Sequence, residues 1–263
     1  MSNKNLKWIY LLILSLVWGS SYILIKKSLI GLTPLQVGSL RTILSTLLLL
    51  IIGYSSIKTI PKNKWKWIAI TGYVSFIPPF LFAYAQTEID SALAAILNSL
   101  TPLATLLIGI GFYRFKIDSK QISGVILGLI GSVLLMYQGS VINPDQNIVY
   151  VIFIILASIL YALQVNLLKV YLQDVSAVAI TVGNFIFIFP FAVVIFFMTD
   201  YNELDLNDKD VSSALFYILI LSIFGTVFAK ILFNKFVQIA SPVFVSSVTY
   251  TLPVVALFWG LLD

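Results

Sequence analysis

The sequence predicts an all-helical protein embedded in a membrane, and two features of it lead to this prediction. Hydrophobic residues make up 60% of the 263 residues and charged residues only 10%, with a mean hydropathy of +1.02. A soluble domain keeps about a quarter of its residues charged, so this chain lacks the polar surface that water would need. The apolar residues also come in runs of about 20, the length of a helix that crosses a bilayer. We therefore expect a bundle of spanning helices joined by short loops.

Nine spans are expected along the chain. Lys4 and Lys7 precede an apolar run that continues to Ile25 without a small-residue cleavage site, so we interpret it as a retained first helix rather than a signal peptide. The further spans are predicted at 34–53, 65–86, 91–113, 120–138, 148–168, 177–198, 212–234 and 241–262.

The charges of the loops predict how the chain is oriented. Basic residues crowd the amino terminus and every second loop: Lys4, Lys7, Lys58, Lys62, Lys64, Lys66, Arg114, Lys116, Lys120, Lys169 and Lys235. The alternate loops carry the acids Glu88, Asp90, Asp145, Asp200, Glu203, Asp205, Asp208 and Asp210. Because cytoplasmic loops are rich in Lys and Arg, the amino terminus is expected in the cytoplasm, in a multi-pass protein of a bacterial inner membrane. The net charge of +5 is assigned to this loop bias, and no nucleic-acid partner is expected.

Catalysis is not expected. The chain has no histidine and no cysteine, which removes imidazole and thiolate chemistry, and its acids fall in loops or at span ends. An intramembrane protease would need a Ser–His pair, paired aspartates or a metal site, and the spans offer none of these. We therefore expect neither an enzyme, nor a cofactor, nor a metal site.

An internal repeat divides the chain into two halves, 1–140 and 147–263. Asn98-Ser99-Leu100-Thr101-Pro102 in the fourth span is echoed by Thr249-Tyr250-Thr251-Leu252-Pro253 in the ninth, and 157–169 resembles 14–26. Two units of five spans enter a membrane from opposite sides, so the halves are predicted to be inverted repeats, as in many secondary transporters. The second unit has no counterpart of the fifth span. The expectation is a fragment that lacks a tenth helix, and a natural nine-span protein is the alternative.

These motifs together resemble the EamA-like family of the drug/metabolite transporter superfamily. The matching residues are Trp18-Gly19-Ser20-Ser21 with Lys26, Leu32-Thr33-Pro34, Leu40-Arg41, 91–97, Leu100-Thr101-Pro102-Leu103, Gly124, Gly128, Gly131, Ser241-Pro242, Leu252-Pro253-Val254 and Trp259-Gly260. The resemblance covers the whole chain and implies ten helices, cytoplasmic termini, a central cavity and export of amino acids or other small metabolites. One departure is Tyr113-Arg114-Phe115-Lys116, where the family usually has a Gly-Glu pair after the fourth span.

Polar side chains within the spans are the candidates for substrate binding. The expected binding residues are Trp18, Tyr22, Arg41, Tyr84, Asn98, Thr101, Tyr161, Gln164, Asn166, Thr249 and Tyr250, and the expected helix breaks or hinges are Pro78, Pro79, Pro102 and Pro253. A proline inside a helix removes a hydrogen bond, and matched breaks in two repeats point to a transporter's binding site. Arg41 is open to three roles, as a structural link, a substrate contact or a headgroup contact. Lys26 and Lys230 lie nearer span ends and are expected to snorkel to the bilayer surface.

A transporter of small metabolites such as amino acids, working by alternating access, is the predicted function. No carboxylate is expected within the spans, so the prediction is a facilitator or exchanger, or else a carrier with unconventional coupling. Efflux of amphipathic drugs is the alternative substrate class. A channel and a non-transporting scaffold are further alternatives.

Overall fold

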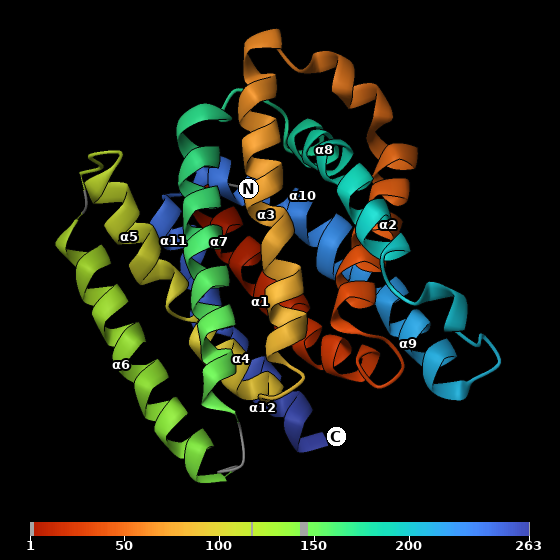
Figure 1. Ribbon diagram of the computed structural model, residues 1–263. Helices are drawn as coiled ribbons and strands as arrows, with labels where there is room; N and C mark the ends of the chain where they lie inside the picture. The colour runs from red at the N-terminus through yellow and green to blue at the C-terminus, as the bar shows by residue number, and fades with distance from the viewer. Residues whose placement is uncertain (1–2, 117, 143–146, 263) are drawn as a thin grey trace.

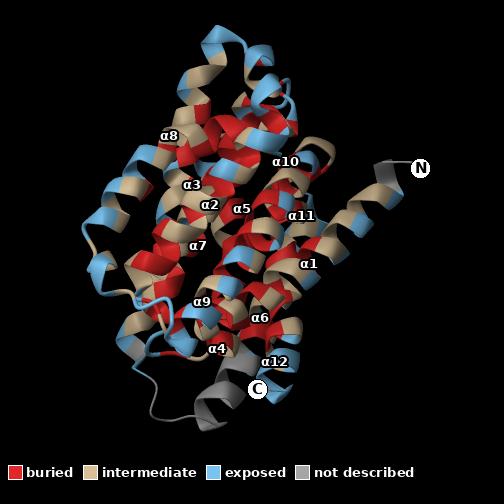
Figure 2. Cartoon of the chain, turned by 90° about the vertical axis from the view of Figure 1, so that its right-hand side faces the viewer, coloured by how far each residue is buried: buried red, intermediate tan, exposed pale blue. Residues whose placement is uncertain are grey.

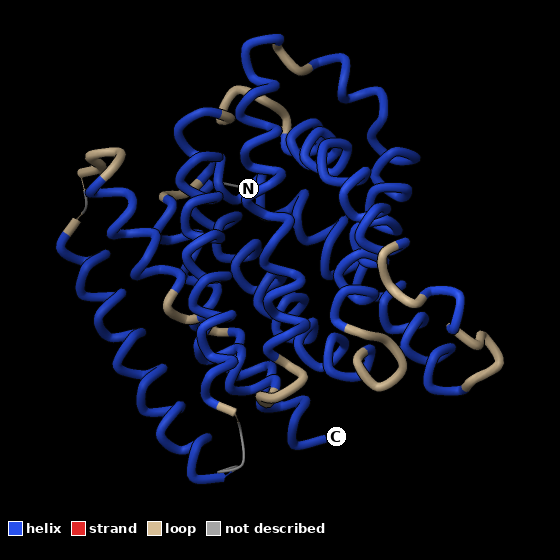
Figure 3. Tube along the Cα trace, in the orientation of Figure 1, coloured by secondary structure: helices blue, strands red, loops and turns tan. Residues whose placement is uncertain are grey.

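The computed structural model describes residues 3–116, 118–142 and 147–262, and these residues form helices joined by short loops, with no strand among them (Figures 1 and 3). Eight segments of the described chain are long and apolar enough to cross a membrane. The predicted fifth span corresponds to α6 (Ser119–Ile142), which lies at the edge of the bundle beside α4 and α5. The expected all-helical membrane fold is confirmed.

Six of the nine spans are single helices: α1 (Asn3–Ser28), α2 (Pro34–Gly53), α3 (Trp65–Ala85), α6, α7 (Val151–Tyr171) and α8 (Ala177–Phe197). The other three are divided. Span 4 consists of α4 (Ser91–Asn98) and α5 (Thr101–Gly111), and span 8 of α9 (Lys209–Ile220), a π-helical segment (Leu221–Phe228) and α10 (Ala229–Ile239). Span 9 consists of α11 (Pro242–Ser246), a 3₁₀ segment (Ser247–Tyr250) and α12 (Leu252–Leu262).

Local sequence sets where several of these helices begin. Thr33 caps α2 with a reciprocal pair of bonds, because its hydroxyl accepts from the Gln36 backbone N–H while the Gln36 side chain accepts from the Thr33 N–H. Ser176 and Ser241 cap α8 and α11 with a single bond each, in which the serine hydroxyl accepts from a backbone N–H of the first turn. Pro34 and Pro242 each occupy the first turn, where a backbone N–H has no intrahelical partner to lose.

The helices pair in a pattern that repeats after five spans. Helix α1 packs against α9, α10 and α12, and α7, five spans later, packs against α3, α4 and α5. Helices α2 and α8 pack against each other. Buried residues gather along the centre of this arrangement, and exposed residues cover its rim (Figure 2). Many of the exposed side chains are large and apolar, including Leu12, Ile51, Leu107, Phe191 and Phe216, as expected of a surface that faces lipid.

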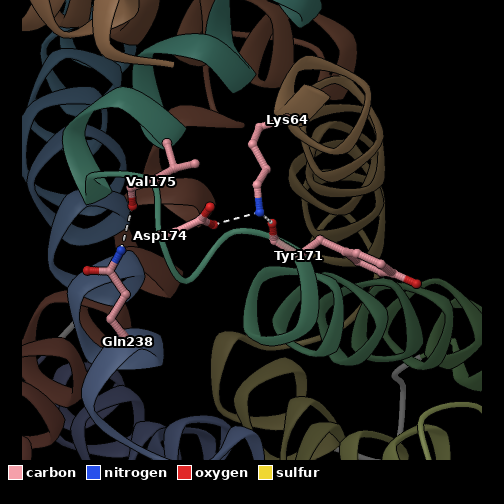
Figure 4. A network of polar contacts seen from close by, with 5 residues as sticks. All are labelled: Lys64, Tyr171, Asp174, Val175 and Gln238. Carbon is pink, nitrogen blue, oxygen red and sulfur yellow. Dashed lines mark hydrogen bonds and ion pairs between the residues drawn. The ribbon is translucent and has the colours of Figure 1, made fainter. Parts of the chain in front are cut away.

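Loops that carry basic residues meet at one end of the bundle, which we call the basic end. Lys64, before α3, bonds the Tyr171 carbonyl (2.8 Å) and forms an ion pair with Asp174 (2.7 Å), while Gln238 donates to the Val175 carbonyl (2.7 Å; Figure 4). These contacts join the loop before α3, the loop before α8 and the end of α10.

Loops that carry acidic residues meet at the opposite end, which we call the acidic end. The Asn147 N–H donates to the Glu88 carbonyl (3.4 Å). Gly31, in the loop after α1, lies so close to the start of α9 that a Cβ there would be 2.4 Å from the Asp210 carbonyl oxygen. Alternate loops therefore lie at opposite ends, as the charge pattern predicts. Which end faces the cytoplasm stays a prediction.

We expect the Lys64–Asp174 ion pair to make a small, pH-dependent contribution to the stability of the folded state. The hydrogen bond from Lys64 holds the pKa of the Asp174 carboxyl below its ordinary value. A depressed pKa stabilises the folded state above the ordinary aspartate pKa of about 4, and this contribution is lost as the pH falls through the lower, folded value. The Asp174 side chain is 58% exposed, so Asp174→Asn should cost less than about 1 kcal/mol.

Thermal unfolding in detergent, measured at pH 7 and again near pH 3, checks this prediction. The wild type and Asp174→Asn should differ slightly at pH 7 and converge at the lower pH. Asp200→Asn, at the acidic end, serves as the matched control. A difference that grew on acidification would contradict the sign argued here.

Candidate functional site

A cavity lies between the two halves and receives side chains from eight of the nine spans. It encloses about 1000 Å³, including the space at its mouth. The lining residues are Trp18, Ser21, Tyr22, Ile25, Arg41, Thr42, Ser75, Phe76, Pro79, Phe82, Asn98, Thr101, Tyr161, Gln164, Val165, Phe185, Ile188, Thr226, Lys230, Phe233, Ser246, Val248, Thr249 and Leu252.

The break in span 4 is held by Asn98, the last residue of α4. Its amide nitrogen donates to the Tyr22 hydroxyl (2.9 Å), and its amide oxygen accepts from the hydroxyls of Thr101 (2.9 Å) and Ser158 (3.3 Å). Asn98 is 5% exposed, so these bonds satisfy a polar group that would otherwise be buried without partners. One side chain thus links the break to α1, α5 and α7.

The breaks in spans 4 and 9 contact each other directly. Ser99, in the turn between α4 and α5, donates its hydroxyl to the Thr249 carbonyl (3.1 Å) of the 3₁₀ segment. Irregular backbone at membrane depth is tolerated where protein or a water-filled cavity satisfies its polar groups, and here the Ser99 hydroxyl satisfies the Thr249 carbonyl. The two motifs that the sequence shows as repeats are therefore joined at the cavity wall.

The prolines near these breaks lie where the helices begin again. Pro102 and Pro253 stand at the breaks of spans 4 and 9, each as the second residue of a new helix, α5 or α12, and not in a helix interior. In a first turn the missing N–H costs no hydrogen bond, so these prolines begin helices rather than kink them. Pro78 and Pro79 do lie inside α3, where Pro79 faces the cavity. Their role as a hinge stays a prediction.

The π-helical segment of span 8 is a feature that hydropathy did not predict. Its Gly225 carbonyl accepts from Trp18 Nε1 (3.1 Å) and from Arg41 Nη2 (3.2 Å), while the Thr226 hydroxyl accepts from Arg41 Nε (2.7 Å). A Cβ on Gly225 would lie 2.7 Å from Ser21 Oγ, so glycine permits α1 to approach this closely. Single π turns within helices are frequent at functional sites because they redirect backbone carbonyls.

Lys230 is the lining residue that sequence reasoning placed elsewhere. Its ammonium bonds the Gln164 side-chain oxygen (3.3 Å) and lies over the Tyr161 ring, 5.3 Å from the centroid. The expectation that Lys230 snorkels to the bilayer surface is therefore wrong. The π turn upstream sets the rotation of α10 and with it the direction of this side chain. Lys26 contacts the end of α3 instead, through the Gln86 carbonyl (2.8 Å).

The charges of the lining all have one sign. Arg41 and Lys230 are its two charged residues, and no aspartate or glutamate of the described chain joins them. The hydrogen-bond partners of both cations are neutral: a hydroxyl, a backbone carbonyl and an amide. Around them, rings of Trp18, Tyr22, Phe82, Tyr161 and Phe233 make most of the remaining wall apolar.

Most of the candidate binding residues meet at this cavity. Its lining includes Trp18, Tyr22, Arg41, Asn98, Thr101, Tyr161, Gln164 and Thr249. Three candidates lie outside the lining. Tyr84 packs against the Phe153 ring, Asn166 donates to the carbonyls of Thr105 (3.1 Å) and Ala162 (2.8 Å), and the Tyr250 hydroxyl donates to the Val125 carbonyl (3.1 Å).

Those outer contacts are structural links between helices. Tyr250 joins the 3₁₀ segment to α6, and its ring fills the place that a Cβ on Gly128 would take, 2.4 Å from Tyr250 Cζ. Asn166 joins α7 to α5. Of the G-x-x-x-G pair in α6, Gly128 therefore packs within the chain, whereas Gly124 has open space beside it.

Several known proteins are similar to this chain in sequence or in fold. Similar proteins include an uncharacterized transporter of Archaeoglobus fulgidus, 29% identical over 58% of this chain and 53% of the relative, and Protein PagO of Salmonella typhimurium, 26% identical over 46% and 41%. An uncharacterized transporter of Buchnera aphidicola is 23% identical over 62% and 55%. The matches thus span about half of each relative. A solved crystal structure shares the fold over 99% of this chain and 88% of its own, with a TM-score of 0.74 and 13% identity.

The chain also matches the sequence profile of a whole protein family. The profile of the EamA-like transporter family matches residues 6–137 and again residues 148–262. The two matched ranges together cover most of the chain. The chain belongs to the EamA-like transporter family.

Proposed function

We propose that this protein moves small metabolites, amino acids among them, across a bacterial inner membrane by alternating access. The observation that carries the proposal is the central cavity, which is lined from both halves and bounded by the touching breaks of spans 4 and 9. Broken helices at a repeat interface are where secondary transporters bind their substrates. The lining members of the candidate set, with Lys230, are the proposed binding residues.

The halves 1–140 and 147–263 are proposed to act as inverted repeats. Their helix pairing recurs after five spans, which supports a two-fold relation about an axis through the cavity. Rocking of one half against the other about that axis would open the cavity to each side in turn. The amino terminus is proposed to face the cytoplasm, in accord with the basic end of the bundle.

Facilitated exchange is the proposed mode. No acid of the described chain lines the cavity, so the lining offers no carboxylate to carry a proton through the cycle. Purified protein in liposomes should exchange labelled amino acids or related metabolites saturably, at a rate that does not depend on a pH gradient. A rate that needed the gradient would overturn the facilitator mode. Folded protein that exchanged no small metabolite would overturn the transport proposal.

Efflux of amphipathic compounds is the second candidate. The aromatic wall of the cavity favours it, because flat rings bind apolar bodies of many shapes. Expression in a drug-sensitive bacterium separates the two candidates. Protection against toxic amino acid analogues supports metabolite export, and protection against lipophilic drugs alone supports the second candidate.

A further inference from the structure

The two cations of the cavity have no counter-charge among the residues that the structure describes. Arg41 uses two of its five N–H donors on Thr226 and Gly225, and Lys230 bonds only Gln164 and faces a ring. Ion pairs elsewhere in the chain, such as Lys64–Asp174, lie outside the cavity. An uncompensated charge within a membrane protein is costly, so residues of this kind usually line an ion or substrate pathway.

The placement of the cations makes them available to one ligand. Arg41 projects from α2, in the first half, and Lys230 from α10, in the second, and both line the same cavity. A guanidinium fork and an ammonium are the two side-chain groups that best bind carboxylates. An anion between them would supply the missing counter-charge and would also contact both halves.

The rest of the wall restricts the ligand further. The rings of Trp18, Phe82 and Phe233 offer an apolar surface rather than hydrogen-bond partners, which suits a solute with an apolar body. An ammonium group on that solute would meet two like charges and no carboxylate. Like charges brought together in a low dielectric disfavour binding.

We infer that the cavity selects organic anions, solutes that combine a carboxylate with an apolar body and carry a net negative charge, over zwitterionic amino acids and over amines. This inference rests on the proposed transport function and specifies the substrate class of the same site.

Three probes with one phenyl body and different charges test the inference: 3-phenylpropionate, phenylalanine and phenethylamine. Each is measured in exchange by proteoliposomes, with protein-free liposomes to subtract passive leakage, and in binding, as the rise of the unfolding midpoint in detergent. The anion should bind at about tenfold lower concentration than the other two, a difference that corresponds to 1.4 kcal/mol.

Lys230→Gln removes one cation without changing the fold of α10. It should weaken binding of 3-phenylpropionate about tenfold and change phenylalanine much less, because only a net anion relies on both charges. Lys235→Gln, on the same helix but exposed, is the matched control and should change neither. Lys230→Arg keeps the charge and should restore the preference for the anion.

The outcomes separate the inference from the transport proposal. Equal or tighter binding of phenylalanine overturns the inference and leaves transport standing. Selective binding of the anion without any exchange supports the inference and counts against transport. If Lys230→Gln and Lys235→Gln behave alike, the cavity cation does not set the preference and the inference fails.

Discussion

Replacing Arg41 with alanine should reduce exchange about tenfold or more while the protein stays folded. Its guanidinium ties α2 to the π-helical segment through Thr226 and Gly225 and places a fixed positive charge on the cavity wall. The Gly225 carbonyl keeps its bond from Trp18, so removing Arg41 does not leave that carbonyl without a partner. The cost in stability should therefore be about 1–3 kcal/mol, and the larger effect should fall on transport.

Proteoliposome exchange of the best-bound phenyl probe and thermal unfolding in detergent measure the two effects separately. Arg41→Lys keeps the charge but not the planar fork, and we expect it to retain part of the exchange. Arg114→Ala changes the same residue type in an exposed loop at the basic end and should leave exchange unchanged. Unchanged exchange and stability in Arg41→Ala would remove Arg41 from the site.

Replacing Asn98 with leucine should destabilise the protein by about 2–4 kcal/mol, since each buried hydroxyl left unpaired costs about 1–3 kcal/mol. Leucine has a similar volume, so the loss is one of hydrogen bonds rather than of packing. The Tyr22 and Ser158 hydroxyls would lose the partners that the structure gives them. The Thr101 hydroxyl would keep its bond to the backbone carbonyl of residue 98 (2.7 Å), which the substitution does not change.

The unfolding midpoint in detergent measures this loss. Asn202→Leu, an exposed site at the acidic end, is the control and should leave the midpoint nearly unchanged. We also expect Asn98→Leu to lower exchange, because the break in span 4 would lose its links to α1 and α7. An unchanged midpoint would show that the side-chain bonds of Asn98 contribute little to the stability of the folded protein.

Hydropathy alone was enough to predict the all-helical membrane fold, because crossing a bilayer demands apolar length and little else. The repeated Asn98 and Thr249 motifs also led to the cavity, since a proline after a polar turn marks a break in a buried helix. What hydropathy does not encode is the rotation of a helix about its axis, and most of the misplaced residues are explained by that rotation.

Helix α7 illustrates this point. Tyr161 and Gln164 are three residues apart, lie on one face and line the cavity. Asn166 follows Gln164 by two residues, about 200° around the helix, so it cannot share that face. Tyr84 stands in the same relation to Phe82 in α3. Helical periodicity, applied to the whole candidate set, is therefore enough to place Asn166 and Tyr84 outside the cavity lining.

Helical periodicity does not predict the direction of the Lys230 side chain. Its direction depends on the π-helical segment, and the hydrogen-bond pattern of that segment leaves no trace in the composition of an apolar span. The small residues Gly225 and Thr226 mark its location, but small residues are common wherever membrane helices pack closely.

The π-helical segment has a consequence for how this protein can change over evolutionary time. Each residue added to or removed from a helix turns everything downstream by about 100°. A one-residue deletion between Leu221 and Phe228 would preserve the apolar character of span 8, and unless the π-helical turn tightened to an α-helical one, it would rotate Lys230 away from the cavity. The amount of positive charge on the cavity wall therefore depends on the length of one turn as well as on residue identity.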